Sequence, residues 1–64
     1  MSYYQLFGTN DNGQIEPIFG AYDREDVAFE KDILREESEF TKVHIIRYAN
    51  ADKAQDAINA ILGE

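Results

Sequence analysis

Residues 3–19 read YYQLFGTNDNGQIEPIF, and this stretch decides how the rest of the chain can fold. Both of its ends are rich in aromatic and β-branched residues, which favour strands. The middle is dense in turn-forming residues, and its Asn12-Gly13 pair tolerates the positive φ angles of a tight turn. We therefore predict a β-hairpin over residues 3–19, with strands over residues 3–7 and 14–19.

A single proline then sets the strand order. Pro17 lies inside the second predicted strand, and a proline cannot donate a hydrogen bond to a sheet, so this strand should lie at an edge. If the chain next crosses over through a helix, the third strand most simply pairs with the first. The predicted order is 2-1-3, with the first strand central and antiparallel to both neighbours.

Three further elements follow the hairpin. The side chains of Asp23 and Asn50 can each cap a helix N-terminus, and Gly63 can end the second helix. No glycine or proline interrupts the first helix, and β-branched residues fill the strand between the two helices. We predict a single α+β domain over residues 1–64, ordered ββαβα, with a three-stranded antiparallel sheet and two helices. The predicted bounds after the hairpin are helix 23–39, strand 41–48 and helix 50–62.

The packing of the two predicted helices stays open. In the first helix, apolar residues fall within one arc of about 160° that should face the sheet. Both faces of the hairpin are partly apolar, with Tyr3 and Phe7 on one face and Leu6 on the other. The helices can cover one face and leave the aromatics exposed, they can cover opposite faces, or a second copy can cover the aromatic face. The apolar arc contains Val27, Phe29, Ile33, Leu34 and Phe40.

Length and composition exclude several classes of function. The chain has 64 residues, no cysteine, 13 acidic and 6 basic residues, and a net charge of −7. Disulfides and thiolate zinc sites are therefore excluded, and so is a two-domain enzyme. The charge opposes direct binding to nucleic acid or to an anionic membrane. With no signal-peptide pattern and no long apolar run, we expect a cytoplasmic protein.

The sequence offers no catalytic or cofactor motif. His44 is the single histidine. Of the two serines, Ser2 lies in the frayed N-terminus and Ser38 lies in the weak C-terminal end of the first predicted helix. A nucleophile, base and orienting carboxylate would have to assemble around that histidine. The four glycines are spaced too widely for a phosphate-binding loop, and the 10–13 loop lacks the carboxylates of a calcium loop. We predict that the protein is not an enzyme and holds no cofactor or metal.

Charge is concentrated in the first predicted helix. Residues 23–39 carry eight acidic and three basic side chains, so 17 residues hold −5 of the total charge. Ordered carboxylates can steer toward a basic groove and occupy it. Glu30 and Glu37 fall inside the apolar arc, where they either reach out at its rim or meet cationic groups such as Arg47 or those of a partner. The predicted contacts are Asp26, Glu30, Asp32, Glu36 and Glu37, with Tyr3 and Phe7 as aromatic anchors.

These features favour a non-catalytic acidic protein-binding module. The expected partner is a protein with a basic surface, namely a nucleic-acid-processing enzyme of a host. The expected role is that of a small inhibitor or modulator, of the type encoded by phages and mobile elements. The alternative is a homodimeric structural or accessory subunit whose acidity serves only solubility.

Overall fold

The computed structural model of the chain describes residues 1–37 and 40–63. The strands join in the order β2-β1-β3, and both pairs are antiparallel. The predicted α+β class, the ββαβα order and the 2-1-3 sheet are therefore confirmed. The elements are β1 (Tyr3–Thr9), β2 (Ile15–Ala21), α1 (Arg24–Glu37), β3 (Lys42–Tyr48) and α2 (Ala51–Ile61).

The hairpin turn closes around the side chain of Asn10. Its Oδ1 atom accepts hydrogen bonds from the backbone N–H groups of Asn12, at 2.9 Å, and Gln14, at 3.0 Å. Gly13 adopts a φ of 82°, which a residue with a Cβ atom rarely adopts. These hydrogen bonds satisfy backbone N–H groups in the turn, where the pairing between β1 and β2 ends. They hold β1 and β2 in register.

Both hairpin strands end two residues later than predicted, and Gly8 and Gly20 therefore lie inside them. Gly8 lies within β1, and a Cβ atom there would come within 2.7 Å of the side chains of Ile18 and Phe40. The glycine therefore permits close packing inside a strand and does not end it.

The two outer edges of the sheet differ. Pro17 lies in β2, and the β1–β2 register shifts between Leu6 and Phe7, so this edge lacks one donor and carries an irregularity. In contrast, β3 pairs with β1 without interruption from Lys42 to Tyr48 and contains no proline. The edge of β3 is thus the more regular of the two.

Side chains cap both helices as expected. Asp23 Oδ1 accepts from the N–H of Glu25 at 2.9 Å, and Asn50 Oδ1 accepts from the N–H of Lys53 at 2.9 Å. The last two residues of the predicted first helix, 38 and 39, lie outside the described residues. No helix in the described part of the chain has the length and apolar character needed to cross a membrane.

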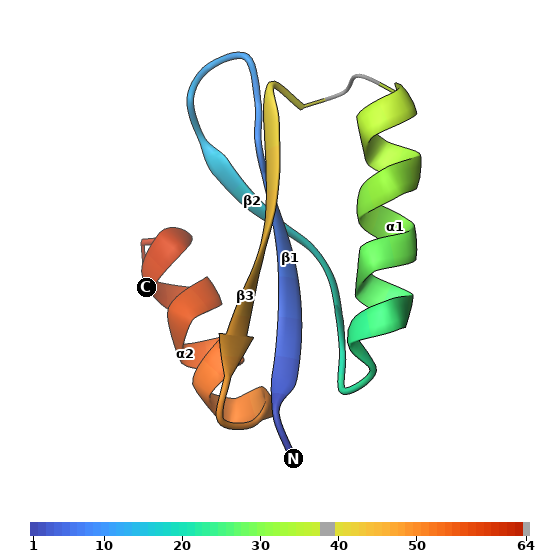
Figure 1. Cartoon of the computed structure of the whole chain (residues 1–64). Coiled ribbons are helices and arrows are strands. Elements are labelled where there is room, and N and C mark those ends of the chain that lie inside the picture. Colours follow the sequence, from blue (N-terminus) through green and yellow to red (C-terminus); the bar gives the residue numbers. More distant parts are fainter. Residues whose placement is uncertain (38–39, 64) are drawn as a thin grey trace.

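The two helices cover opposite faces of the sheet (Figure 1), and each contacts all three strands. On the α1 face, Leu6 packs with Val27 and Leu34 in a buried cluster. The other face of β1 presents Phe7 toward α2, and Phe7 is fully buried. Of the three arrangements left open by the sequence, the structure adopts the one with a helix on each face.

Candidate functional site

The charged residues of α1 separate onto different sides of the helix. Val27 and Leu34 are buried against the sheet and mark its inner side. At about 100° per residue, the six carboxylates of α1 fall within an arc of about 160°, and its three cations fall within about 40° on one flank. The acidic residues are Glu25, Asp26, Glu30, Asp32, Glu36 and Glu37, and the basic residues are Arg24, Lys31 and Arg35.

All five acidic contacts predicted from the sequence lie within this arc. Four of them are exposed, namely Asp26, Asp32, Glu36 and Glu37, whereas Glu30 is half-buried. Asp32 and Glu36 lie one turn apart and line a shallow hollow together with Arg35. The fold therefore places four of the predicted carboxylates on the exposed side of α1 and Glu30 at the margin of that side.

Glu30 and Glu37 lie on the flank of α1 that is away from the cations. Lys31 and Arg35 line a hollow together with residues of β3, so their flank faces β3 and the flank of Glu30 faces β2. Arg47 is in β3, at the opposite edge of the sheet. Glu30 and Glu37 thus lie at the rim of the apolar contact, and Arg47 is not placed to meet them.

Phe29 is the unexpected member of the acidic arc. Its side chain is 65% exposed, although the sequence pattern assigned it to the core. That prediction was wrong because α1 is rotated so that Val27 and Leu34 point at the sheet, which carries Phe29 to the outer side. We call Phe29 and the six carboxylates of α1 the acidic surface. The sequence signal for it was the placement of carboxylates three residues before and after Phe29.

The two aromatic anchors predicted in the hairpin have different environments. Phe7 is fully buried and stacks on His44 with a centroid distance of 5.7 Å. It belongs to the core and is not accessible to a partner, because α2 covers its face of the sheet. Tyr3 is half-buried and packs edge-to-face against Tyr22, which is exposed, at a centroid distance of 5.0 Å.

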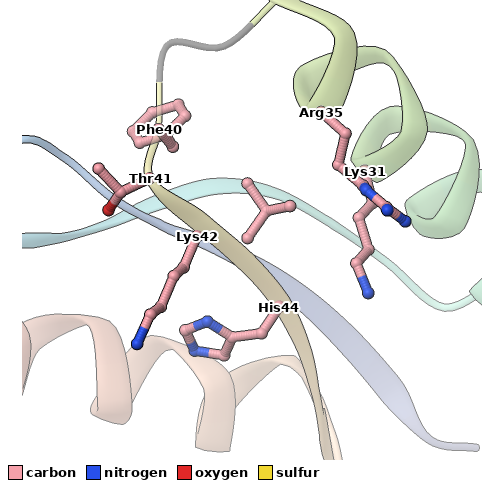
Figure 2. A pocket seen from close by; sticks show the side chains of 7 residues that line it. Lys31, Arg35, Phe40, Thr41, Lys42 and His44 are labelled. Atoms are coloured by element: carbon pink, nitrogen blue, oxygen red, sulfur yellow. The ribbon is translucent and has the colours of Figure 1, made fainter.

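A second charged feature, of opposite sign, lies along the outer edge of β3. Figure 2 shows Lys42 and His44 on one side of this strand and Lys31 and Arg35, from α1, on the other. Together they flank a hollow of about 520 Å³. The negative net charge hides this site in the sequence, because its cations come from separate elements that only packing brings together. The full lining is Lys31, Arg35, Phe40, Thr41, Lys42, Val43 and His44.

The environment of His44 is that of a packed strand residue. Its ring stacks on Phe7, and no carboxylate occurs among the described residues that line the neighbouring hollow. A catalytic imidazole needs a group to orient it, and here its described neighbours in the hollow are mainly cationic or apolar. Within residues 1–37 and 40–63, no cluster of three or more acidic or histidine side chains is suited to hold a metal ion.

Comparisons of the chain with protein-family models, with curated proteins and with solved structures found no match in any of the three. A functional assignment therefore depends on the chemistry of the two charged surfaces. These are the acidic surface of α1 and the cationic hollow at the edge of β3.

Proposed function

We propose that this protein is a non-catalytic binding module whose acidic surface occupies a basic, nucleic-acid-binding surface of another protein. The observation that carries this proposal is the exposed ring of Phe29 among carboxylates that share one side of α1. Charge alone serves solubility equally well. An exposed aromatic ring at the centre of that charge does not add to solubility, and it offers a partner an apolar anchor of the kind that dominates many interfaces.

The density of charge on α1 suits a surface built for a polyanion. The helix has 14 residues and so extends for about 21 Å at roughly 1.5 Å per residue. Six carboxylates over that length give one negative charge per roughly 3.5 Å, against one per about 3.4 Å along each strand of duplex DNA. A protein groove lined with arginine and lysine for a nucleic-acid strand would meet a similar linear density of carboxylates on this side of α1, although the three cations on its flank bring the net charge of the helix to −3.

Phe29 supplies binding energy that the surface charges alone do not. Surface ion pairs contribute only about 0–1 kcal/mol each, because water and salt screen them. An aromatic ring that becomes desolvated at the centre of a contact can contribute several times more. Nucleic-acid-binding surfaces are rich in arginine, and a guanidinium stacks on an aromatic ring with about 0.5–2 kcal/mol. Phe29 is therefore the proposed anchor, and the carboxylates around it select a basic partner.

The proposed role is that of an inhibitor or modulator in the cytoplasm, of the type encoded by phages and mobile elements. A small rigid module that covers a basic groove would compete directly with the nucleic acid for the same surface. Long-range attraction between the acidic surface and the groove would also accelerate association, by roughly 10- to 1,000-fold at low salt.

Affinity capture with matched baits tests this proposal. The test bait carries Asp32→Lys and Glu36→Lys, which reverse two charges of the acidic surface. The control bait carries Asp52→Lys and Asp56→Lys, which make the same net charge change at exposed positions of α2. We expect the wild type and the control to retain a common partner that the test bait loses, and we expect a DNA oligonucleotide to displace that partner.

Two outcomes would contradict the proposal. A partner that binds all three baits equally well does not contact the acidic surface. A partner that excess oligonucleotide leaves in place does not hold this protein through a nucleic-acid-binding groove. A Phe29→Ala bait adds a third comparison, because it removes the proposed anchor and leaves every charge unchanged.

One observation supports the rival assignment of a homodimeric accessory subunit. Ile15, Ile61 and Leu62 line a hollow of about 470 Å³ together with three polar residues of the hairpin, and all three apolar side chains are exposed to water. Such an apolar patch can pair two copies. Light scattering at micromolar concentration distinguishes the assignments, since a stable dimer that Leu62→Asp dissociates would favour the rival.

A further inference from the structure

We infer that the outer edge of β3 is a second binding site, which accepts an acidic peptide segment of another protein as an added strand. This inference is independent of the proposed function of the acidic surface. It rests on the accessibility of a regular strand edge and on the cations that flank that edge on both faces of the sheet.

The backbone of β3 is suited to strand addition. The strand is at the edge of the sheet, and it pairs with β1 in a continuous register from Lys42 to Tyr48. In the described part of the chain no other strand lies against its outer side. Backbone groups on such an edge can hydrogen-bond to an extended peptide, which is a recurrent mode of peptide recognition.

The side chains around this edge specify an acidic occupant. Three of the six lysines and arginines of the chain line the hollow beside β3, although the chain as a whole carries −7. Lys31 and Arg35 lie on the α1 side of β3, and Lys42 lies on the other side together with His44 (Figure 2). Successive side chains of an added strand point to opposite faces of the sheet. Carboxylates on either face of such a strand would therefore meet cations.

The net negative charge of the protein does not prevent this contact. Charges in water are screened beyond about 8 Å at physiological salt, so the nearest side chains dominate the energy of a bound peptide. Asp32 and Glu36 line a hollow with Arg35, whereas the other carboxylates of α1 lie farther from the β3 flank. Phe40 and Val43 add apolar surface to the lining of the hollow, where they can pack against the stems of acidic side chains.

A peptide of another protein fits this edge better than a second copy of the chain does. A copy would extend the sheet through its own β2 edge, where Pro17 removes a donor and the register is irregular. A symmetric pairing of two β3 edges would bring the cations of both copies together. Nucleic acid is also anionic, but it offers no backbone amides or carbonyls that could continue the sheet.

The test uses as the probe a fluorescent decapeptide in which Glu-Glu pairs alternate with Thr-Thr pairs, so that carboxylates and backbone N–H groups of both strand orientations are represented. A matched peptide with proline at every threonine position keeps the charge and removes N–H donors. We expect the first peptide to bind and the proline peptide to bind at least about tenfold more weakly. We expect Lys31→Gln with Lys42→Gln to weaken binding about tenfold. The control variant, Lys53→Glu, makes the same net charge change at an exposed position of α2 outside the hollow, and it should bind as the wild type does.

Amide hydrogen exchange locates the bound peptide. We expect slower exchange at those β3 amides that point away from β1, with no change in α2. The double variant Asp32→Lys and Glu36→Lys should retain peptide binding, so a failure of the acidic-surface proposal leaves this one intact, and the reverse also holds.

Four results would overturn the inference. The first is no binding of the glutamate-threonine peptide at about 1 mM. The second is equal affinity for the proline peptide, which would mean attraction without strand addition. The third is an equal loss of affinity in the Lys31→Gln, Lys42→Gln double variant and in the Lys53→Glu control. The fourth is tighter binding of an oligothymidylate of matched charge, which would identify the hollow as a nucleic-acid site.

Discussion

Replacing Phe29 by alanine separates the two possible roles of this aromatic side chain. If Phe29 belonged to the core, the substitution would damage the fold, as the sequence pattern suggests. If Phe29 is an exposed anchor, the protein should fold almost normally and lose its partner. The structure favours the second result, because 65% of the side chain is exposed.

The size of the effect follows from the exposed fraction. A phenylalanine buries about 200 Å² when fully enclosed, so Phe29 withdraws roughly 70 Å² from water, worth about 1.7 kcal/mol. Alanine recovers about 0.5 kcal/mol of helix propensity at the same position. We therefore expect Phe29→Ala to lower the free energy of unfolding by about 1 kcal/mol, and Tm by roughly 4–8 °C.

Leu34→Ala is the matched control on the same helix. Leu34 is buried in the cluster with Leu6 and Val27, and replacing a buried leucine by alanine costs about 2–5 kcal/mol. A 64-residue domain has a total stability of only about 3–10 kcal/mol, so this control should be severely destabilised. Urea unfolding followed by circular dichroism and tyrosine fluorescence measures both variants, since the chain has no tryptophan.

A loss of about 3 kcal/mol or more in Phe29→Ala would refute this reasoning, because a largely exposed ring cannot contribute that much. The side chain would then be enclosed in solution, and the acidic surface would have no aromatic anchor. If the Phe29→Ala variant is stable and binds the captured partner as tightly as the wild type does, the described fold stands but Phe29 does not contact the partner.

Gly8→Ala should destabilise the fold by about 1–3 kcal/mol, because the added Cβ atom would lie 2.7 Å from the ring of Phe40. A decrease in the urea midpoint of less than a few tenths of a molar would contradict this expectation. Asn50→Ala should cost about 1 kcal/mol through loss of the cap to the Lys53 N–H, and unchanged thermal unfolding would show that the cap contributes nothing. Glu36→Lys should stabilise the free protein by about 0.3–1 kcal/mol, since Glu36 lies in the last turn of α1, at the negative end of the helix dipole, and should weaken partner binding. A gain in stability with unchanged affinity would exclude Glu36 from the contact.

Glu36 and Glu37 lie at the end of α1 where a carboxylate lowers the stability of the helix. Acidic residues at a helix C-terminus oppose the dipole, and α1 has only Arg35 as a basic residue in its last turn. Residues that lower stability often serve binding, because selection for function tolerates a modest loss of stability. The stability and the affinity of Glu36→Lys are therefore best measured on the same preparation.

Local chemistry made the elements and the sheet order predictable from the sequence alone. Asn12-Gly13 specified the turn, and Pro17 placed its strand at an edge because a missing donor is tolerated only there. Asp23 and Asn50 marked the helix starts by offering side-chain acceptors to unpaired N–H groups. Each of these rules acts within a few residues.

The roles of the aromatic residues and of the cations were decided only by tertiary structure. Sheet alternation and helix periodicity show which side chains share a face. They do not show which helix covers which face of the sheet when both faces have similar apolar content. Because α1 and α2 pack on opposite faces, Phe7 became core. The rotation of α1 on the sheet left Phe29 in water. The cationic hollow also joins residues of α1 to residues of β3, which only packing brings together.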